Sequence, residues 1–386
     1  MRVMRAEPSR FSDVTARSVG AVWRAYDLQL TTYAALLGAV GLVMAYTNSV
    51  EAGQSVLANG TVFSRALMWS GLAIVAFLVA TAFDYRWLRT LRWPVYFVNV
   101  ALLVLTMAIG DGVGGSARWV AIGPLTFQFS ELAKILMIAV LAGYLGDRES
   151  KLDSLSAILG AVVLMGPPIV LVMLQPDLGT SLVLAAILGG MLFMSGASLK
   201  WLIAGAAGVL AAIPVAWTYV LRDYQKDRIL SFLSPAADAQ GSNFQVAQSQ
   251  IAVGSGGLLG TGLTNGSQGR GGFLPVQESD FVFAILSQEL GFIGAIVVFL
   301  LFAALLWRVL SSAWRSRDPF GTLFGAGLAS MILFQVFVNV GMVIGILPVT
   351  GIPLPFITHG GASLVSIAIG LGVIQSINIR QHRAEW

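Results

Sequence analysis

The sequence predicts an all-α polytopic membrane protein with about ten transmembrane helices, both termini cytoplasmic, and one large extracytoplasmic loop between helices 7 and 8. The first observation is composition: 56% of the 386 residues are hydrophobic and only 11% are charged, whereas a soluble chain carries about 25% charged residues. The second is a series of apolar runs approaching the roughly 20 residues that span a bilayer. The third is the placement of basic residues in alternate connecting segments. Together they exclude a soluble enzyme, a disordered chain and a nucleic-acid-binding protein.

Ten apolar segments account for the predicted helices. The first follows a tail with five arginines, and it is long enough to remain as an uncleaved helix rather than a signal peptide. The fourth is short. The fifth contains Gly166-Pro167-Pro168, so we expect a kink or a break there. In order, the segments run Leu28–Tyr46, Ala66–Phe83, Pro94–Ile109, Glu131–Leu145, Ala157–Leu174, Gly179–Ser195, Leu202–Val220, Phe281–Leu306, Leu323–Ile346 and Gly361–Ile377.

The basic residues set the predicted orientation. With the N-terminus inside, 16 of the 23 Lys and Arg residues fall in cytoplasmic segments, as the positive-inside rule requires. The chain then divides into a cytoplasmic tail (1–27), one transmembrane domain (28–379) and a second cytoplasmic tail (380–386). The longest connection, about 221–279, falls outside, and loops of that length are usually functional or disordered. The chain has no cysteine, which excludes disulfides and thiolate metal sites.

Ionisable residues inside predicted spans are candidates for function, because burying a charge in a bilayer is costly. Glu131 and Lys134 are three residues apart and share a helix face. They form an internal ion pair or line a polar cavity, and the two interpretations are compatible. Asp280 begins the eighth span, where it either caps the helix or acts as a general base at the mouth of a cavity. Glu289, nine residues further on, is expected to pack against a polar partner.

The loops outside the membrane contain three further patterns. Arg222, Lys226 and Arg228 would clamp phosphates or form a self-paired surface turn. The glycine-rich run Gly254–Gly262 superficially resembles a dinucleotide-binding loop, but no βαβ unit surrounds it. A flexible loop that shapes a substrate site is the better interpretation. Asp177 lies in a tight turn between two spans, where a helix cap is expected.

Several ordered motifs resemble the SEDS family (shape, elongation, division and sporulation), from the first span to the last. The segment Gly345–Pro355 is more similar to the elongation branch than to the division branch. Two positions differ: this chain has Thr358-His359 where the family usually has Ser-Tyr, and Glu278 where a basic residue or His is common. The motifs are Arg118–Trp119, Phe127–Lys134, Gln175–Ser181, Asp223–Gln225 with Arg228, Gln248–Gly257, Phe273–Pro275, Ser279–Ala284, Glu289–Gly291, Asn339–Met342, Gly345–Pro348 and Gly351–Phe356.

The resemblance implies a peptidoglycan glycosyltransferase that polymerises lipid II at the outer face of the bacterial cytoplasmic membrane during elongation. It also implies a class B penicillin-binding protein, a transpeptidase, as partner. Asp280 is then the general base and undecaprenyl diphosphate the leaving group. The candidates for binding that diphosphate are Arg118, Arg222, Lys226, Arg228 and Arg270. The other candidates are Glu131 and Lys134 in the architecture of the cavity, and Asp177, Gln248, Glu289 and His359 in its lining.

Cofactors and competing functions complete the expectations. No metal-ligand spacing is visible, so no tightly bound cofactor is expected, although Mg²⁺ or Mn²⁺ would bridge a diphosphate and Asp280. One alternative is a lipid II flippase, which must open to both faces; no inverted repeat of the transporter kind is visible. The other is a non-enzymatic scaffold of the elongation machinery, which predicts that Asp280 is dispensable.

Overall fold

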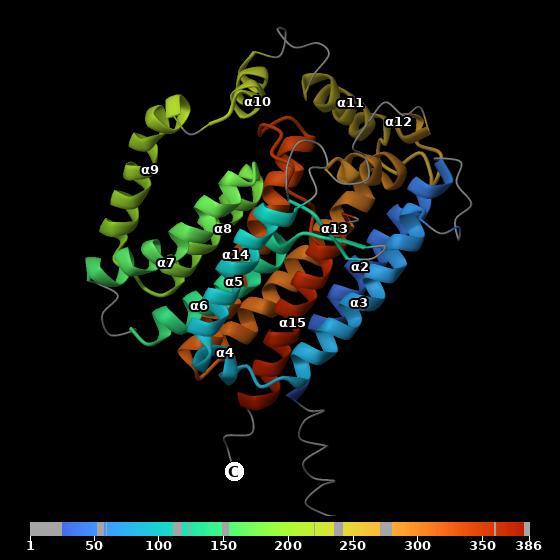
Figure 1. The fold of residues 1–386 in the computed structure, drawn as a ribbon. Helices are drawn as coiled ribbons and strands as arrows, with labels where there is room; N and C mark the ends of the chain where they lie inside the picture. The colour runs from blue at the N-terminus through green and yellow to red at the C-terminus, as the bar shows by residue number, and fades with distance from the viewer. Residues whose placement is uncertain are drawn as a thin grey trace, which may run out of the picture.

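Long helices crossing one another at moderate angles make up most of the chain (Figure 1). The computed structural model describes residues 25–51, 58, 60–110, 118–122, 125–148, 154–219, 221–234, 242–270, 280–358 and 360–381. The elements are α2 (Leu28–Glu51), α3 (Val62–Ala82), α4 (Arg86–Thr90), α5 (Arg92–Ile109), β1 (Val120–Ile122), β2 (Leu125–Phe127), α6 (Phe129–Gly146), α7 (Leu155–Leu174), α8 (Leu178–Met194), α9 (Leu199–Tyr219), α10 (Asp223–Leu233), α11 (Ser242–Ser255), α12 (Ser267–Arg270), α13 (Val282–Arg315), α14 (Pro319–Val343) and α15 (Gly361–Gln381). Helices α10 to α12 gather at one end of the bundle, called here the loop end, opposite the C-terminus.

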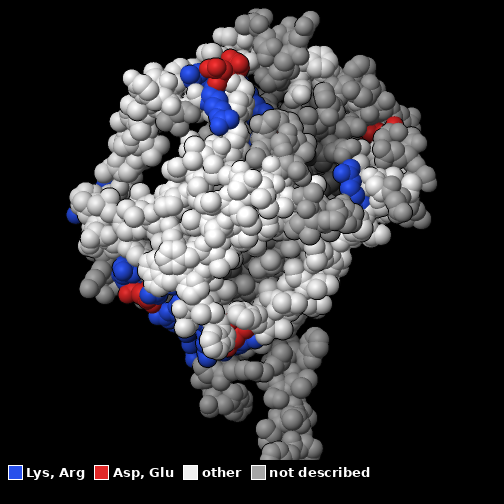
Figure 2. Space-filling view, viewed as in Figure 1, with Lys and Arg blue, Asp and Glu red and all other residues white. Residues whose placement is uncertain are grey.

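The bundle has the lengths and surface of a multi-pass membrane protein. Within the described ranges, nine helices are long and apolar enough to cross a membrane, and α8 is a shorter apolar helix of 17 residues. A helix of about 17 residues still reaches across the hydrocarbon core, so α8 accounts for the tenth expected span. Ile74, Val163 and Val209 expose 61 to 71% of their surface on the outside of the bundle. Figure 2 shows Lys and Arg gathered toward the two ends, with a wide uncharged band between them.

Helix α14 lies at the centre of the bundle. It packs against α6, α8 and α13, while α15 packs mainly against α3 and α6. Small residues allow these close approaches: a Cβ atom on Gly327 of α14 would lie only 2.7 Å from the sulfur of Met191 on α8. Small residues at helix contacts are typical of membrane bundles, where van der Waals packing rather than the hydrophobic effect holds helices together. The core is therefore built for close helix contact around α14.

Three local features differ from expectation. Helix α7 continues from Leu155 to Leu174 through Pro167 and Pro168, so of the kink or break expected there, the break is wrong. Prolines are tolerated in membrane helices because neighbouring groups satisfy the backbone they release. The interruption occurs instead in α13, at Gly291 (φ 68°, ψ −171°). A two-stranded antiparallel hairpin, β1 and β2, precedes α6, although an all-α chain was expected.

The loop that follows α11 supplies hydrogen-bond partners for the backbone groups on both sides of the break in α13. The amide nitrogens of Thr261 and Gly262 donate to the carbonyls of Gln288 and Glu289, at 3.0 and 3.1 Å. Beyond the break, the nitrogen of Phe292 donates to the carbonyl of Gly257, at 2.9 Å. Irregular backbone at membrane depth is tolerated where protein satisfies its polar groups. The glycine-rich run is thus a hydrogen-bonded packing element, which replaces its expected role as a flexible substrate-shaping loop.

An ionic cluster joins helices at the end opposite the loop end. Arg89 bonds Asp147 at 2.9 Å and Asp318 at 3.3 Å, and Arg92 also bonds Asp147. Burial raises the pKa of the Asp147 carboxyl, but the hydrogen bonds and charges of Arg89 and Arg92 outweigh it, so the pKa lies below its usual value. The cluster ties α4 and α5 to the end of α6 and the start of α14.

Candidate active site

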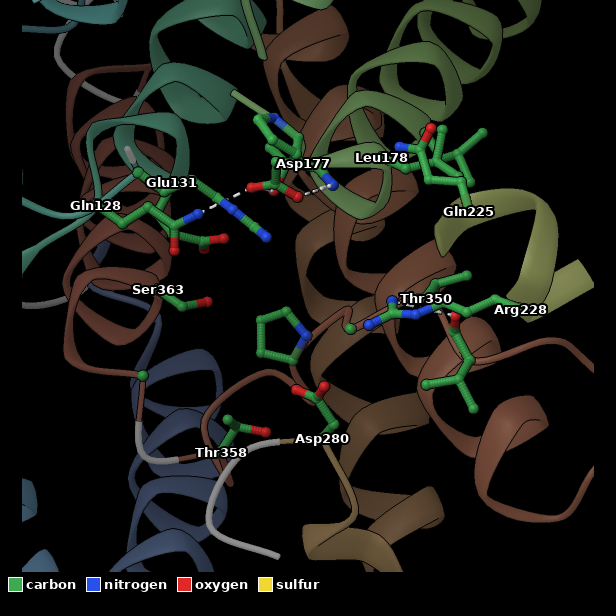
Figure 3. A pocket seen from close by; sticks show the side chains of 18 of the residues that line it. Gln128, Glu131, Asp177, Leu178, Gln225, Arg228, Asp280, Thr350, Thr358 and Ser363 are labelled. Carbon is green, nitrogen blue, oxygen red and sulfur yellow. Dashed lines mark hydrogen bonds between the residues drawn. The ribbon is translucent and has the colours of Figure 1, made fainter. Parts of the chain in front are cut away.

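A cavity of about 380 Å³ opens at the loop end, between the ends of the central helices and helix α10. Its lining mixes apolar with charged side chains (Figure 3). The charged lining residues are Arg118, Glu131, Asp177, Arg228 and Asp280, from five separate parts of the chain. A concave site with a few convergent polar groups is the usual form of a binding site, so this cavity is the candidate active site.

Asp280 lies two residues before the first residue of α13, and it lines the cavity. Helix α13 begins at Val282 with Phe281 as its N-cap, and no side chain caps it. The capping interpretation of Asp280 is therefore not what the structure shows. Asn339 of α14 holds the backbone here, because its Nδ2 donates to the carbonyls of Asp280 (3.1 Å) and Ile352 (2.8 Å). In Figure 3 the Asp280 carboxylate points into the space between Thr358 and Arg228.

Helix α10 carries the second charged group into the cavity. The hydroxyl of Tyr224 donates to the carbonyl of Pro176 (2.9 Å), which docks α10 on the turn between α7 and α8. Arg228, one turn further along, donates to the carbonyl of Val349 (3.4 Å) and reaches the cavity wall. Lys226 instead lies 3.8 Å from the fully exposed Asp223. The structure thus divides the predicted cluster, because Arg228 lines the cavity whereas Lys226 belongs to a surface pair.

Arg118 lies on the cavity wall just before the hairpin that leads into α6. Its Nε is buried and has no hydrogen-bond partner among the described residues. A buried donor without an acceptor is costly, and an anionic ligand in the cavity would supply one. Arg118 and Arg228 are therefore the described arginines that line the cavity and fit an anion.

The remaining acidic groups on the wall are held by protein partners. Lys134 Nζ lies 2.8 Å from Glu131 Oε2, and the two side chains are 2% and 6% exposed. The pair is therefore both an internal ion pair and part of the cavity wall, because Glu131 also lines the cavity. Asp177 caps α8 through the nitrogen of Thr180 (3.0 Å), as expected, and also accepts from Gln128 Nε2 (2.9 Å) and from the Thr180 hydroxyl (2.9 Å).

Other candidates lie elsewhere or outside the described residues. Arg222, Gln248 and Glu289 are not among the residues that line the cavity. The side chain of Arg270 and all of Glu278 and His359 are outside the described part of the chain. The sequence interpretation assigned no role in the cavity to several polar residues that line it. Gln128 and Ser363 lie at the beginnings of α6 and α15, and this position at a helix start could have indicated a role in the cavity. The other polar lining residues become neighbours only when the chain folds. The full set without an assigned role is Gln128, Gln225, Thr350, Thr358 and Ser363.

The arrangement suits transfer of a group that leaves as an anion. Asp280 is placed to take a proton, and Arg118 and Arg228 are placed to stabilise negative charge. Within the described ranges, no group of three or more His, Cys, Asp or Glu side chains could hold a metal ion. The carboxylates that line the cavity are those of Glu131, Asp177 and Asp280.

The chain is similar to several known proteins. The family model of cell cycle proteins FtsW, RodA and SpoVE matches residues 27–383. The peptidoglycan glycosyltransferase MrdB of Escherichia coli K12 is 41% identical over 287 residues, which cover 73% of this chain and 76% of MrdB. The stage V sporulation protein E of Bacillus subtilis is 35% identical over 365 residues, which cover 91% of this chain and 96% of that protein.

Two solved structures share the fold. A chain of a peptidoglycan synthase complex that coordinates polymerisation and crosslinking has a TM-score of 0.77 and 29% identity, covering 92% of this chain and 98% of that one. The rod shape determining protein RodA of Thermus thermophilus has a TM-score of 0.69 and 27% identity, covering 93% of this chain and 98% of RodA. The chain therefore belongs to the FtsW, RodA and SpoVE family of membrane proteins, the SEDS family.

Proposed function

We propose that this chain is a peptidoglycan glycosyltransferase that polymerises lipid II at the outer face of the bacterial cytoplasmic membrane during elongation. The relatives named as glycosyltransferases support the reaction class. The observation that carries the proposal is that the carboxylate of Asp280 and the guanidinium groups of Arg118 and Arg228 line the same cavity. Such a cavity matches a reaction in which a hydroxyl loses its proton to the carboxylate and a diphosphate leaves beside the guanidinium groups.

The proposed reaction is a single displacement at the anomeric carbon of the donor. The 4-hydroxyl oxygen of the acceptor's GlcNAc forms the new glycosidic bond while the bond to undecaprenyl diphosphate breaks. Asp280 takes the hydroxyl proton, and the bonding electron pair leaves with the diphosphate. One carboxylate suffices because diphosphate leaves without protonation, unlike the alkoxide leaving group of a glycosidase. A base of this kind contributes about 10²–10⁴-fold, and inversion converts the α-linked donor into a β-linked product.

Two arginines would bind the departing diphosphate. Guanidinium groups bind phosphate oxygens through paired, charge-assisted hydrogen bonds, and Arg118 brings a donor without a partner among the described residues. Mg²⁺ or Mn²⁺ would neutralise more of the developing charge, with Asp280 and the phosphates as its ligands. Removal of divalent ions by EDTA should then slow polymerisation, and added Mg²⁺ should restore it.

Helix α9 offers a route for lipid-linked substrates. None of its residues is buried, and it makes its contacts mainly with α8. Figure 2 shows an opening between α9 and the body of the molecule. Polyprenyl chains need to reach the cavity from the bilayer, and a helix that stands apart from the bundle leaves a lateral path toward it.

A penicillin-binding transpeptidase is the proposed partner. The support is the similarity to a chain of a peptidoglycan synthase complex in which polymerisation and crosslinking are coordinated. A transpeptidase beside the polymerase would receive the glycan strand as it forms, which explains why two enzymes would be held together.

The test is reconstitution with fluorescent lipid II in liposomes, with and without the transpeptidase, followed by electrophoresis of the glycan. We expect product from the wild type and none from Asp280→Asn. The matched control is Asp223→Asn, because the Asp223 side chain is 99% exposed and outside the cavity lining. Full polymerisation by Asp280→Asn would refute the assignment of the base. If the wild type moves lipid II between leaflets without product, the protein is a flippase; if it does neither, it is a scaffold.

A further inference from the structure

The loop that follows α11 carries an exposed apolar surface at the loop end. Leu258 and Leu259 expose 69% and 79% of their surface, and Leu263 is also exposed. No charged residue occurs from Ser242 to Gly269, whereas a chain in contact with water carries about 25% charged residues. We call Gly256–Gly266 the leucine loop. Its three exposed leucines are not among the residues that line the candidate active site, so this surface is separate from the proposed chemistry.

The leucine loop lies against α13 directly beyond the break. Helix α11 packs against α13 (Figure 1), and the loop continues this contact. The nitrogens of Phe292 and Ile293 donate to the carbonyls of Gly257 (2.9 Å) and Leu258 (3.2 Å). Phe292 and Ile293 are themselves exposed, and they begin an apolar exposed face of α13 that continues through Leu300. The exposed leucines therefore adjoin a helix face of the kind that contacts lipid.

The charges on α13 locate this contact relative to a bilayer. Arg308 bonds Asp27, the residue before α2, at 2.6 Å, and the α13 sequence has no other charge between Arg308 and Glu289. The helix rises about 24 Å from Arg308 to Phe292 at 1.5 Å per residue, and a tilted helix covers less depth. The hydrocarbon core is roughly 30 Å thick. With the pair of Arg308 and Asp27 at one edge of the core, the leucine loop meets α13 inside the other edge.

A loop at that depth needs partners for its backbone within the protein, because lipid supplies none. The nitrogens of Thr261 and Gly262 donate to carbonyls of α13, as described above, and the nitrogen of Gly260 donates to the carbonyl of Gly256 at 2.8 Å. Gly260 has φ 80°, and a side chain there would overlap the carbonyl of Glu289, so this approach requires glycine. The loop thus directs these backbone groups toward protein and its leucines outward.

We propose that the leucine loop is embedded in the bilayer, with Leu258, Leu259 and Leu263 in contact with lipid acyl chains. Transfer of these apolar side chains from water to hydrocarbon is favourable, and the surrounding charge-free sequence does not oppose it. The leaflet is the outer one in the orientation given under the proposed function. Because the loop also binds the carbonyls of Gln288 and Glu289, its insertion would fix the height of the first part of α13 relative to the membrane.

The test uses single cysteines, because the chain has none of its own. Leu258→Cys, Leu259→Cys and Leu263→Cys are each labelled with the fluorophore NBD in the full chain and reconstituted in liposomes. Lipids with a nitroxide near the headgroup or near the chain end report contact with lipid, and iodide on both sides of the membrane reports contact with water. Leu300→Cys is the lipid control, since Leu300 is exposed about 12 Å from Arg308 along the helix. Asp223→Cys is the water control, since the Asp223 side chain is 99% exposed.

The three loop labels should behave as groups in the outer part of the hydrocarbon core. We expect emission at shorter wavelength than from the label at Asp223, loss of iodide quenching, and stronger quenching by the headgroup nitroxide than by the chain-end nitroxide. The label at Leu300 should show the opposite preference between the two nitroxides. None of these measurements uses lipid II, so a failure of the proposed reaction would leave them unchanged.

Two results would overturn the proposal. Iodide quenching of the loop labels as strong as that of the label at Asp223 would place the leucines in water. Labels that neither nitroxide nor iodide quenches would show that protein, such as a second copy of the chain, covers the loop instead of lipid.

Discussion

The buried ion pair of Lys134 and Glu131 gives a quantitative prediction for Lys134→Met. The substitution keeps the length of the side chain but leaves the Glu131 carboxylate, which is only 6% exposed, without its cation. Removing one partner of a buried ion pair costs about 3–5 kcal/mol. Because Glu131 lines the cavity and can meet water there, we expect the lower end, about 3 kcal/mol. With a shift of about 2–4 °C per kcal/mol, the apparent melting temperature should fall by about 6–12 °C.

The assay is thermal unfolding of the purified protein in detergent, followed by intrinsic fluorescence at one fixed scan rate. The double variant Glu131→Gln/Lys134→Met should recover most of the loss, because it removes the stranded charge together with its partner. Lys200→Met is the matched control, since Lys200 is exposed on α9. A difference of about 2 °C corresponds to less than about 1 kcal/mol. The reasoning is refuted if the melting temperature of Lys134→Met lies within about 2 °C of the wild type, or if the double variant is no more stable than the single one.

Three further predictions follow from the other contacts. Gly291→Ala should lower the melting temperature strongly, because its Cβ would lie 2.2 Å from a backbone nitrogen at a positive φ, whereas Gly205→Ala on α9, where the space is open, should not. The pKa of Asp147 lies below its usual value, so its ion pairs stabilise the fold at neutral pH and are lost as the pH falls below about 4; melting curves of Asp147→Asn and the wild type should differ at pH 7 and converge in that acidic range. Arg228→Lys keeps the charge but loses the paired geometry, so lipid II polymerisation should slow, with a larger rise in KM than fall in kcat.

The spans could be predicted from sequence because length and apolarity are local properties. Each predicted segment from Leu28–Tyr46 to Gly361–Ile377 overlaps a helix of the structure. Proline was a less reliable signal for a break in a helix, since Pro167 and Pro168 lie within a continuous α7. The hairpin before α6 was missed because its two strands have three residues each, which is too short for an alternating pattern to be recognised.

The site was predictable in part, for reasons that differ between residues. Glu131 and Asp280 are ionisable groups within or at the start of apolar runs, and such groups are rarely placed there without a role. Arg222 and Arg228 are alike in sequence, but only the docking of Tyr224 on Pro176 turns the helix so that Arg228 reaches the cavity. A selection of this kind depends on contacts between distant segments, so the local pattern could not make it.

The break in α13 shows how such a contact bears on the site. The segment from Val282 to Leu290 is a short helix held at both ends by other parts of the chain. At its beginning, Asn339 binds the carbonyl of Asp280, and at its end the loop after α11 binds the carbonyls of Gln288 and Glu289. A nine-residue helix spans about 13 Å, so these two attachments fix both the depth and the rotation of the segment that presents Asp280. Neither attachment has a local signature, because a glycine in an apolar run and an asparagine in another become partners only when the bundle has formed. The position of the proposed base is thus determined by the tertiary structure, although the sequence already offered Asp280 as a candidate.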